Sequence, residues 1–395
     1  MKRFFSYTIL SFFLLLLPTG QASANNNDSI RLSLLTCAPG EEIYSLFGHT
    51  AIRYENPSQG IDVVFNYGLF SFNTPNFIFR FSLGETDYQL GATDYERFAA
   101  EYAFFGRSVW QQTLNLTDEE KTELIRLLQE NYRPENRVYR YNFFYDNCAT
   151  RPRDKIEESI AGKVVYPAEP QDGSLTFRDI VHQYCKGHPW ARFGIDLCIG
   201  SEADQPITQR QMMFAPFYLM DAFDGAQIKS DSIQRPLITA NELVVDATPE
   251  PDESDWMPTP LQCSLLLFIL TAAATIYGIR RRTGLWGIDL FLFGIAGIVG
   301  CVLAFLALFS QHPAVNSNFL LLVFHPGQLL FLPYIIYCVR KGKKCWYLTL
   351  NLAVLTLFIV LFPVIPQRFD FAVVPLALVL LIRSASNLIV TSKKK

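Results

Sequence analysis

The stretch DATPEPDESDWMPTP, residues 246–260, divides the sequence into two parts of different composition. It is rich in proline and acidic residues and has no apolar periodicity, which is typical of a linker. Residues 25–260 contain 20 Lys and Arg against 35 Asp and Glu, a net charge of −15. Residues 261–395 contain 12 Lys and Arg and only 2 Asp and Glu. We therefore expect an acidic domain over residues 25–245 and a basic, apolar domain after the linker.

The part after the linker has the pattern of a membrane domain. Five apolar segments lie near residues 261–279, 287–309, 319–339, 346–363 and 371–390. Each is close to the ~20 residues that cross ~30 Å of hydrocarbon. Lys and Arg cluster at alternate ends of these segments, in residues 280–282, 340–344 and 393–395. Because such clusters stay in the cytoplasm, residue 260 is expected on the outer side of a bacterial inner membrane that the chain crosses five times.

The first 24 residues have the features of a secretory signal peptide. Met1-Lys2-Arg3 supplies the positive end, an apolar run follows, and Ala22-Ser23-Ala24 is a small-x-small cleavage site. A cleaved peptide and an uncleaved anchor remain alternatives, and both export the acidic domain. The expected direction agrees with that given by the basic clusters, so the acidic domain is predicted to be periplasmic.

The third apolar segment contains the sequence FHPGQLLFLP, residues 324–333. Proline removes a backbone donor and kinks a helix, and polar groups at this depth often mark function. A simple kink with His325 at the interface and a functional break in the helix are both left open.

The acidic domain has the pattern of an α+β fold with a mainly antiparallel sheet. Strands are expected near residues 30–37, 49–54, 61–67, 108–116 and 138–143. The capping-box pairs Thr93-x-x-Glu96 and Thr117-x-x-Glu120 predict helices near 94–105 and 118–131. A further helix is expected from about Asn147.

Two stretches carry the chemistry: YSLFGHTAIRY, residues 44–54, and YDNCATRPRD, residues 145–154. In this pattern His49 begins a strand and Cys148 stands near a helix start. A helix N-terminus lowers the pKa of a thiol, and its N–H groups stabilise an oxyanion. An imidazole on a facing strand then serves as the base, whatever the order in the chain. This layout predicts a papain-like cysteine site, although a buried structural His and Cys are the alternative.

A third residue is expected to orient the imidazole. If residues 49–54 and 61–67 form a hairpin around residue 58, the position opposite His49 is 66 or 67. Asn66 is therefore the candidate, with Asp62, nearer the turn, as the alternative. Pro152 weakens the helix-dipole argument, because it would push on the carbonyl of Cys148 in a helix that began at Asn147. The helix either starts later, near Thr150, or has a distorted first turn.

Other candidate sites are weaker. A disulfide between Cys185 and Cys198 is compatible with an oxidising periplasm, but spacing alone does not establish it. The run from His182 through Cys185 to His188 has an unfavourable spacing for a metal site, and we predict neither a metal nor a cofactor. The acidic charge excludes nucleic acid as an expected partner.

At these motifs the chain resembles the Lnb family of Bacteroides-type envelope proteins, which are implicated in lipoprotein N-acylation. The similar pieces are LFGHTAIRY (46–54), VFNYGLFSF (64–72), YDNCATRPRD (145–154), MMFAPFYLMDAFDGAQI (212–228) and SQHPAVNSNFLLLVFHPGQLLFLP (310–333). The acidic domain is also similar to permuted papain-like folds, a superfamily with cell-wall peptidases and lipid acyltransferases.

The resemblance implies a lipoprotein N-acyltransferase. Cys148, deprotonated by His49, would take an acyl chain from a membrane phospholipid and pass it to the α-amine of a diacylglyceryl-cysteine lipoprotein. The kinked third segment would then offer lateral access for the chain. A cell-wall peptidase or amidase, a phospholipase, and a scaffold protein with an inactive site are the alternatives.

Overall fold

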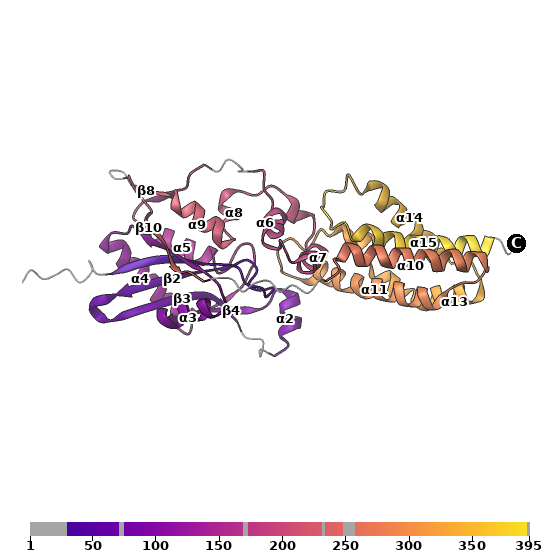
Figure 1. Cartoon of the computed structure of the whole chain (residues 1–395), viewed down its shortest axis with the longest axis horizontal. Helices are drawn as coiled ribbons and strands as arrows, with labels where there is room; N and C mark the ends of the chain where they lie inside the picture. Colours follow the sequence, from indigo (N-terminus) through magenta and orange to yellow (C-terminus); the bar gives the residue numbers. More distant parts are fainter. Residues whose placement is uncertain (1–29, 71–74, 169–172, 231–233, 248–256, 393–395) are drawn as a thin grey trace, which may run out of the picture.

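The computed structural model describes residues 30–70, 75–168, 173–230, 234–247 and 257–392. An N-terminal domain built on a sheet and a helical domain lie end to end in an elongated molecule (Figure 1). The predicted signal peptide, the central part of the linker and the basic cluster 393–395 lie outside the described residues.

The N-terminal domain is built on a seven-stranded sheet with the strand order β10-β5-β1-β2-β3-β4-β6. Every neighbouring pair is antiparallel, which confirms the predicted sheet class. The strands are β1 (Arg31–Cys37), β2 (His49–Asn56), β3 (Ile61–Leu69), β4 (Asp87–Asp94), β5 (Val109–Leu114), β6 (Val138–Arg140) and β10 (Ile238–Val245). Five of them correspond to the expected strands. The pattern of β4 and β10 was not recognised in the sequence.

Helices cover both faces of this sheet. On one face α4 (Asp118–Tyr132), α5 (Thr150–Ser159) and α9 (Pro216–Asp224) pack over a core that includes Leu34 and Ile52. On the other face α3 (Tyr95–Phe104) packs through Phe98 against Leu35 and Val64. Successive side chains of a strand point to opposite faces of the sheet, so neighbouring residues such as Leu34 and Leu35 belong to different cores.

The two predicted capping boxes had different outcomes. Thr117 caps α4, and its side chain and that of Glu120 exchange hydrogen bonds with each other's backbone. The box at Thr93 was wrong, because Thr93 pairs with Val64 inside β4 and α3 begins later, after Asp94. Tertiary pairing in the sheet thus overrides the local capping signal.

Smaller elements complete the domain. They are η2 (Pro57–Gln59), α2 (Phe77–Leu83), β7 (Lys163–Val165), α6 (Phe177–Tyr184), α7 (Pro189–Cys198), η3 (Ser201–Asp204), α8 (Gln209–Met212), β8 (Gln227–Lys229) and β9 (Gln234–Pro236). Strands β7, β8 and β9 form a separate antiparallel sheet. Among these elements, α2 and α7 lie nearest to the helical domain and contact it.

In the helical domain, each of the five predicted apolar segments is largely helical. Three helices are long and apolar enough to cross a membrane: α10 (Pro260–Arg280), α11 (Trp286–Phe309) and α15 (Val373–Ser392). The third segment is broken into η4 (Phe319–Leu322), α12 (Pro326–Leu330) and α13 (Leu332–Lys341), with a bend of 74°. Counted as one span, it makes a fourth. The segment α14 (Trp346–Leu361) has 16 residues, or about 24 Å of helix, and is shorter than a full span. The described residues therefore do not show five full-length spans.

The 74° bend of the third segment lies at Phe331, just before Pro333, and a first interruption lies at His325, just before Pro326. His325 has an extended backbone and is half-buried, with its Nε2 atom 3.4 Å from Oδ1 of Asn351. The structure therefore shows that this segment is interrupted and bent, whereas a function of the interruption stays a hypothesis.

The two domains are joined by backbone hydrogen bonds at one end of the helical domain. The amides of Gly200 and Ser201 donate to the carbonyls of Ala314 and Ser317 at 2.6 and 2.9 Å. Those carbonyls belong to the loop between α11 and η4. The basic clusters at residues 280–282 and 340–344 follow α10 and α13, at the opposite end (Figure 1). This arrangement agrees with the direction that the basic clusters predict.

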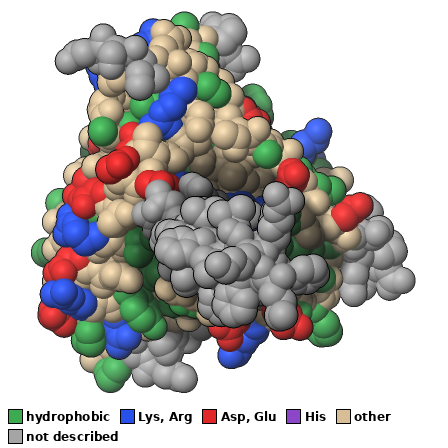
Figure 2. Space-filling model, turned by 90° about the vertical axis from the view of Figure 1, so that its left-hand side faces the viewer, with side chains coloured by type: hydrophobic (Ala, Val, Ile, Leu, Met, Phe, Trp, Pro, Cys, Tyr) green, Lys and Arg blue, Asp and Glu red, His purple; other side chains and the backbone are tan. Residues whose placement is uncertain are grey.

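A buried ion cluster strengthens this junction. The fully buried guanidinium of Arg178 contacts Asp196 at 2.6 Å and Asp204 at 2.9 Å. Asp204 also binds Arg368, from the loop before α15, at 2.9 Å. At the far end of the N-terminal domain, by contrast, acidic and basic side chains are interspersed on the surface (Figure 2).

We expect Arg178→Ala to destabilise the domain junction. Removal of the guanidinium takes away the buried cation that Asp196 and Asp204 share and leaves them with His182 and Arg368 alone. Loss of one partner of a buried ion pair costs up to about 3–5 kcal/mol. The thermal unfolding midpoint of the purified full chain is expected to fall, and hydrogen exchange in residues 310–318 to rise. Arg126→Ala, which removes only a surface pair with Glu123, is the matched control. Equal midpoints for the two variants would contradict the role assigned to Arg178.

Candidate active site

His49 is held at the first position of β2 by a backbone turn that requires glycine. Gly48 has φ of 76°, and a Cβ atom there would lie 2.6 Å from the carbonyl oxygen of Cys37. A side chain at position 48 is therefore disfavoured both by the left-handed backbone and by the clash with this oxygen. Across the strand pair, His49 stands directly opposite Cys37 of β1.

The structure brings Asn66 next to His49. The Oδ1 atom of Asn66 lies 3.3 Å from Nε2 of His49. Because a carbonyl oxygen only accepts, the proton is on Nε2 and the lone pair on Nδ1 remains available. Asn66 pairs with Ala51, so the residue opposite His49 by register would be Gly68, two positions beyond Asn66. The alternative, Asp62, binds Arg53 at 2.7 and 2.9 Å near the turn.

Cys148 lies in a turn immediately before α5. The helix begins at Thr150, so the later of the two expected starts is the observed one. The Oδ1 atom of Asn147 accepts from the amides of Ala149 and Thr150 at 2.8 and 2.9 Å and satisfies these two donors. This arrangement accommodates Pro152 inside the first turn, where the missing N–H has no consequence.

The sulfur of Cys148 reaches the end of the sheet at β2. Strands β2 and β3 pair only as far as Ala51 and Asn66. Beyond that pair, the backbone N–H of Thr50 donates to the sulfur of Cys148. A Cβ atom at Gly68 would lie 3.5 Å from Cβ of Cys148, so the missing side chain leaves room for the cysteine. Cys148 thus meets the strand residue that directly follows His49.

Burial keeps both groups neutral at rest. It raises the pKa of the Cys148 thiol to about 11, although the Thr50 and Cys148 amides lower it in part. Burial also lowers the pKa of His49 to about 4, while the hydrogen bond to Asn66 raises it in part. The direction is opposite to the depression of the thiol pKa expected from the helix N-terminus, because desolvation outweighs the two amide hydrogen bonds. Burial therefore favours a neutral thiol and a neutral imidazole, and the role of His49 as a general base toward Cys148 stays a prediction.

Several neighbours of this site had no recognised signal in the sequence. Burial raises the pKa of the Cys37 thiol to about 12, and its side chain is hydrogen-bonded to Tyr102. Burial, and then a charge on Cys148, raises the pKa of Tyr88 to about 12, so this ring lies near the sulfur. Burial, and then the charge on Cys148, also raises the pKa of Tyr139 and of Tyr141. Tyr88, Tyr139, Tyr141 and Cys148 all belong to or pack against the same apolar cluster of the domain.

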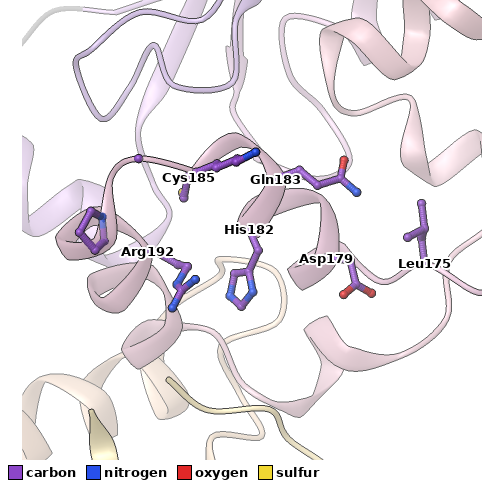
Figure 3. Close-up of a pocket in the computed structure, with 9 residues that line it drawn as sticks. Leu175, Asp179, His182, Gln183, Cys185 and Arg192 are labelled. Atoms are coloured by element: carbon purple, nitrogen blue, oxygen red, sulfur yellow. The ribbon is translucent and has the colours of Figure 1, made fainter. Parts of the chain in front are cut away.

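The remaining candidates lie elsewhere. Cys185 and Cys198 are free thiols in the structure, without the disulfide that was considered. Both carboxylate oxygens of Asp196 lie 2.9 Å from Nε2 of His182. Within the described residues, no group of three or more His, Cys, Asp and Glu side chains is placed to hold a metal ion. A pocket of about 460 Å³ on α6 and α7 is lined by His182, Asp179 and Arg192 (Figure 3), and His49, Asn66 and Cys148 are not among its lining residues.

The site lies at the end of the N-terminal domain that docks on the helical domain. Leu46 and Phe47, just before His49, share a buried cluster with Phe144, four residues before Cys148. The same cluster includes Ala314, which belongs to the loop between α11 and η4. One continuous apolar core therefore connects both motifs to the helical domain.

Two family models match the chain. Residues 20–182 match the Lnb N-terminal periplasmic domain, and residues 252–395 match the Lnb transmembrane domain. No curated protein and no solved structure matches the chain. The first match contains His49, Asn66 and Cys148, and the second contains all of the apolar helices.

We expect alkylation of Cys148 by iodoacetamide to be controlled by a high pKa. Only the thiolate reacts, so the rate of labelling should increase about tenfold per pH unit and level off near the pKa of about 11. Mass spectrometry of the peptide that contains Cys148, at successive pH values, measures this midpoint separately from other cysteines. His49→Ala is the control and should leave the midpoint unchanged. A plateau below pH 7 that is lost in His49→Ala would instead indicate a thiolate–imidazolium pair.

Proposed function

The chain belongs to the Lnb family of lipoprotein-modifying membrane proteins with a periplasmic domain, and from this premise we propose that it is a lipoprotein N-acyltransferase with Cys148 as nucleophile. The acyl donor is a membrane phospholipid and the acceptor is the α-amine of a diacylglyceryl-cysteine lipoprotein. His49 is the general base and Asn66 positions its ring. The enzyme acts at the periplasmic face of the bacterial inner membrane.

The observation that carries the proposal is the position of the site on the membrane side of the domain. Both substrates keep their acyl chains in the bilayer, so the nucleophile must work close to its surface. The apolar cluster that contains Phe47, Phe144 and Ala314 ties the His49 and Cys148 motifs to a loop of the membrane domain. A cell-wall peptidase has no need of such a connection, because its substrate lies outside the bilayer.

In the first step, Nδ1 of His49 takes the proton of the Cys148 thiol as the sulfur attacks an ester carbonyl of the phospholipid. A C–S bond forms, and the negative charge moves to the carbonyl oxygen. The proposal assigns the donor to this oxygen to the backbone N–H of Cys148, which lies beside the sulfur. The C–O bond to glycerol then breaks, the imidazolium returns its proton to the leaving oxygen, and a thioester and a lysophospholipid result.

In the second step, the lipoprotein amine attacks the thioester carbonyl. A C–N bond forms and the C–S bond breaks, while His49 takes a proton from nitrogen and passes it to the leaving sulfur. An amide is more stable than a thioester, so transfer needs no nucleotide. The rings of Tyr88, Tyr139 and Tyr141 limit the access of water to the thioester. This exclusion favours transfer to the amine over the hydrolysis that a phospholipase would perform.

We expect Cys148→Ser and His49→Ala to abolish N-acylation. In cells that depend on each variant, the N-terminal peptide of a lipoprotein should lose the mass of one acyl chain. Mass spectrometry of one purified lipoprotein measures this change. Cys198→Ser, a half-buried cysteine away from the site, is the matched control and should leave the N-terminus acylated.

An unchanged N-terminus in both Cys148→Ser and His49→Ala would refute the acyltransferase. Release of free fatty acid without an acylated amine, from purified protein in phospholipid vesicles, would replace it with a phospholipase.

Asn66→Ala tests the positioning role. Without the acceptor oxygen the ring is no longer fixed, and turnover is expected to fall roughly a hundredfold. Because the Asn66 bond raises the pKa of His49, its loss moves the acid limb of the pH profile to lower pH. Asn66→Asp keeps an acceptor and adds a negative charge, so it should retain more activity and move that limb upward. Profiles that coincide in both variants would contradict this role.

A further inference from the structure

An apolar groove lies between the two domains, away from the loop contacts. It is formed by α2 of the periplasmic domain and by α11 of the membrane domain, and its volume is about 950 Å³. The rings of Phe79 and Phe305 contact each other across it, with centroids 5.9 Å apart. The lining residues are Asn76, Phe77, Ile78, Phe79, Ser82, Cys301, Val302, Phe305 and Leu306. Within the described residues of this lining there is no charged side chain.

Helix α2 is fixed at the outer end of α11. The amide of Gln311 donates to the carbonyl of Leu83 at 2.8 Å, and Nε2 of His312 donates to the carbonyl of Phe81 at 2.6 Å. The apolar side chains of Ile78 and Phe79 are 79% and 59% exposed. A periplasmic helix with this surface, beside the end of a membrane-spanning helix, is placed to lie in the outer lipid interface.

A series of aromatic rings connects the groove to the catalytic cysteine. It begins at Tyr141 and Tyr88, which stack at 4.1 Å beside Cys148. Tyr88 contacts Phe70 at 5.0 Å, and Phe70 stacks on Phe77 at 5.9 Å. Phe77 lines the groove itself. Successive ring contacts therefore lead from the surroundings of Cys148 to the wall of the groove.

We propose that this groove binds the acyl chain that the enzyme transfers. The chain of the donor phospholipid enters between α2 and α11 and extends along Phe77 and Phe70, so that its ester carbonyl reaches Cys148. This inference rests on the proposed acyltransferase and names the part of the molecule that holds the substrate chain. The access route is thus at α2 and α11, and the kinked third segment is not part of it.

The geometry assigns the groove to the donor chain and not to the chains of the lipoprotein. The ring series starts at the sulfur, so it follows a chain that is covalently attached there. During the reaction that chain is the acyl group of the thioester. The acceptor approaches the same carbonyl with its amine, whereas its own acyl chains hang from a glycerol several bonds away and have no attachment to Cys148.

The inference predicts that filling the groove changes the chain-length preference. Val302→Trp places a large ring in it, which leaves less room for a long chain. With purified enzyme, vesicles of short-chain or long-chain phosphatidylethanolamine and a synthetic diacylglyceryl-cysteine peptide, the short-to-long ratio of kcat/KM should rise at least about tenfold. Ile295→Trp, on the same helix with an equally exposed side chain (47% against 52%) that is outside the groove, should keep the wild-type ratio.

A second measurement does not depend on turnover. Cys148→Ala enzyme is irradiated in vesicles that contain a phosphatidylethanolamine with a photoreactive group near the end of one acyl chain. The expected cross-links map to residues 77–82 and 301–306, and Val302→Trp in the same background reduces them. Cross-links spread evenly over the lipid-facing helices, together with an unchanged chain-length ratio in Val302→Trp, would overturn the inference. If instead Cys148→Ala retains N-acylation, the proposed function itself fails, so the two failures are distinguishable.

Discussion

The hydrogen bonds between residues 200–201 and residues 314–317 fix the periplasmic domain, and with it the proposed nucleophile Cys148, relative to the helical domain. A phospholipid ester lies at the membrane surface and a periplasmic domain on a free linker would meet it only rarely. The backbone hydrogen bonds hold the two domains in one fixed arrangement. The ion cluster of Arg178, Asp204 and Arg368 supports the same contact. The position of Cys148 relative to the helical domain and the groove between α2 and α11 both depend on this docking.

Burial at the docked end also bears on the chemistry proposed for Cys148. A solvent-exposed pair would favour a stored thiolate, whereas the burial of Cys148 and His49 favours the neutral forms of both. A thiol that loses its proton only as it attacks reacts slowly with small electrophiles. It also remains resistant to the oxidising periplasm, because oxidation begins from the thiolate. In the proposed enzyme, selectivity for a bound ester would follow from the same desolvation that raises the pKa of the thiol.

The sequence predicted those features that depend on local pattern, and it missed those that depend on register and contact. The basic clusters gave the direction of the membrane domain, and the strand alternation gave the antiparallel class. Asn66 was proposed from a hairpin centred at residue 58, but it pairs with Ala51, so it lies diagonally from His49 and not opposite it. Diagonal side chains still meet when one of them is long. The roles of His49, Asn66 and Cys148 stay predictions, although the structure brings the last two to the same end of β2.

Helix α2 shows why the rest was not predictable. Its sequence FIFRFSL has seven residues and no polar face, so neither helical nor strand periodicity identifies it. It is stabilised by Gln311 and His312, more than 200 positions away. The net charge of −15 in residues 25–260 gives this part of the chain no attraction to anionic lipid headgroups. The exposed side chains of Ile78 and Phe79 can provide an attraction to lipid instead, because their apolar surface would be buried in the lipid interface. An acidic domain can therefore work at a membrane, provided that its contact with lipid is apolar and its position is set by docking.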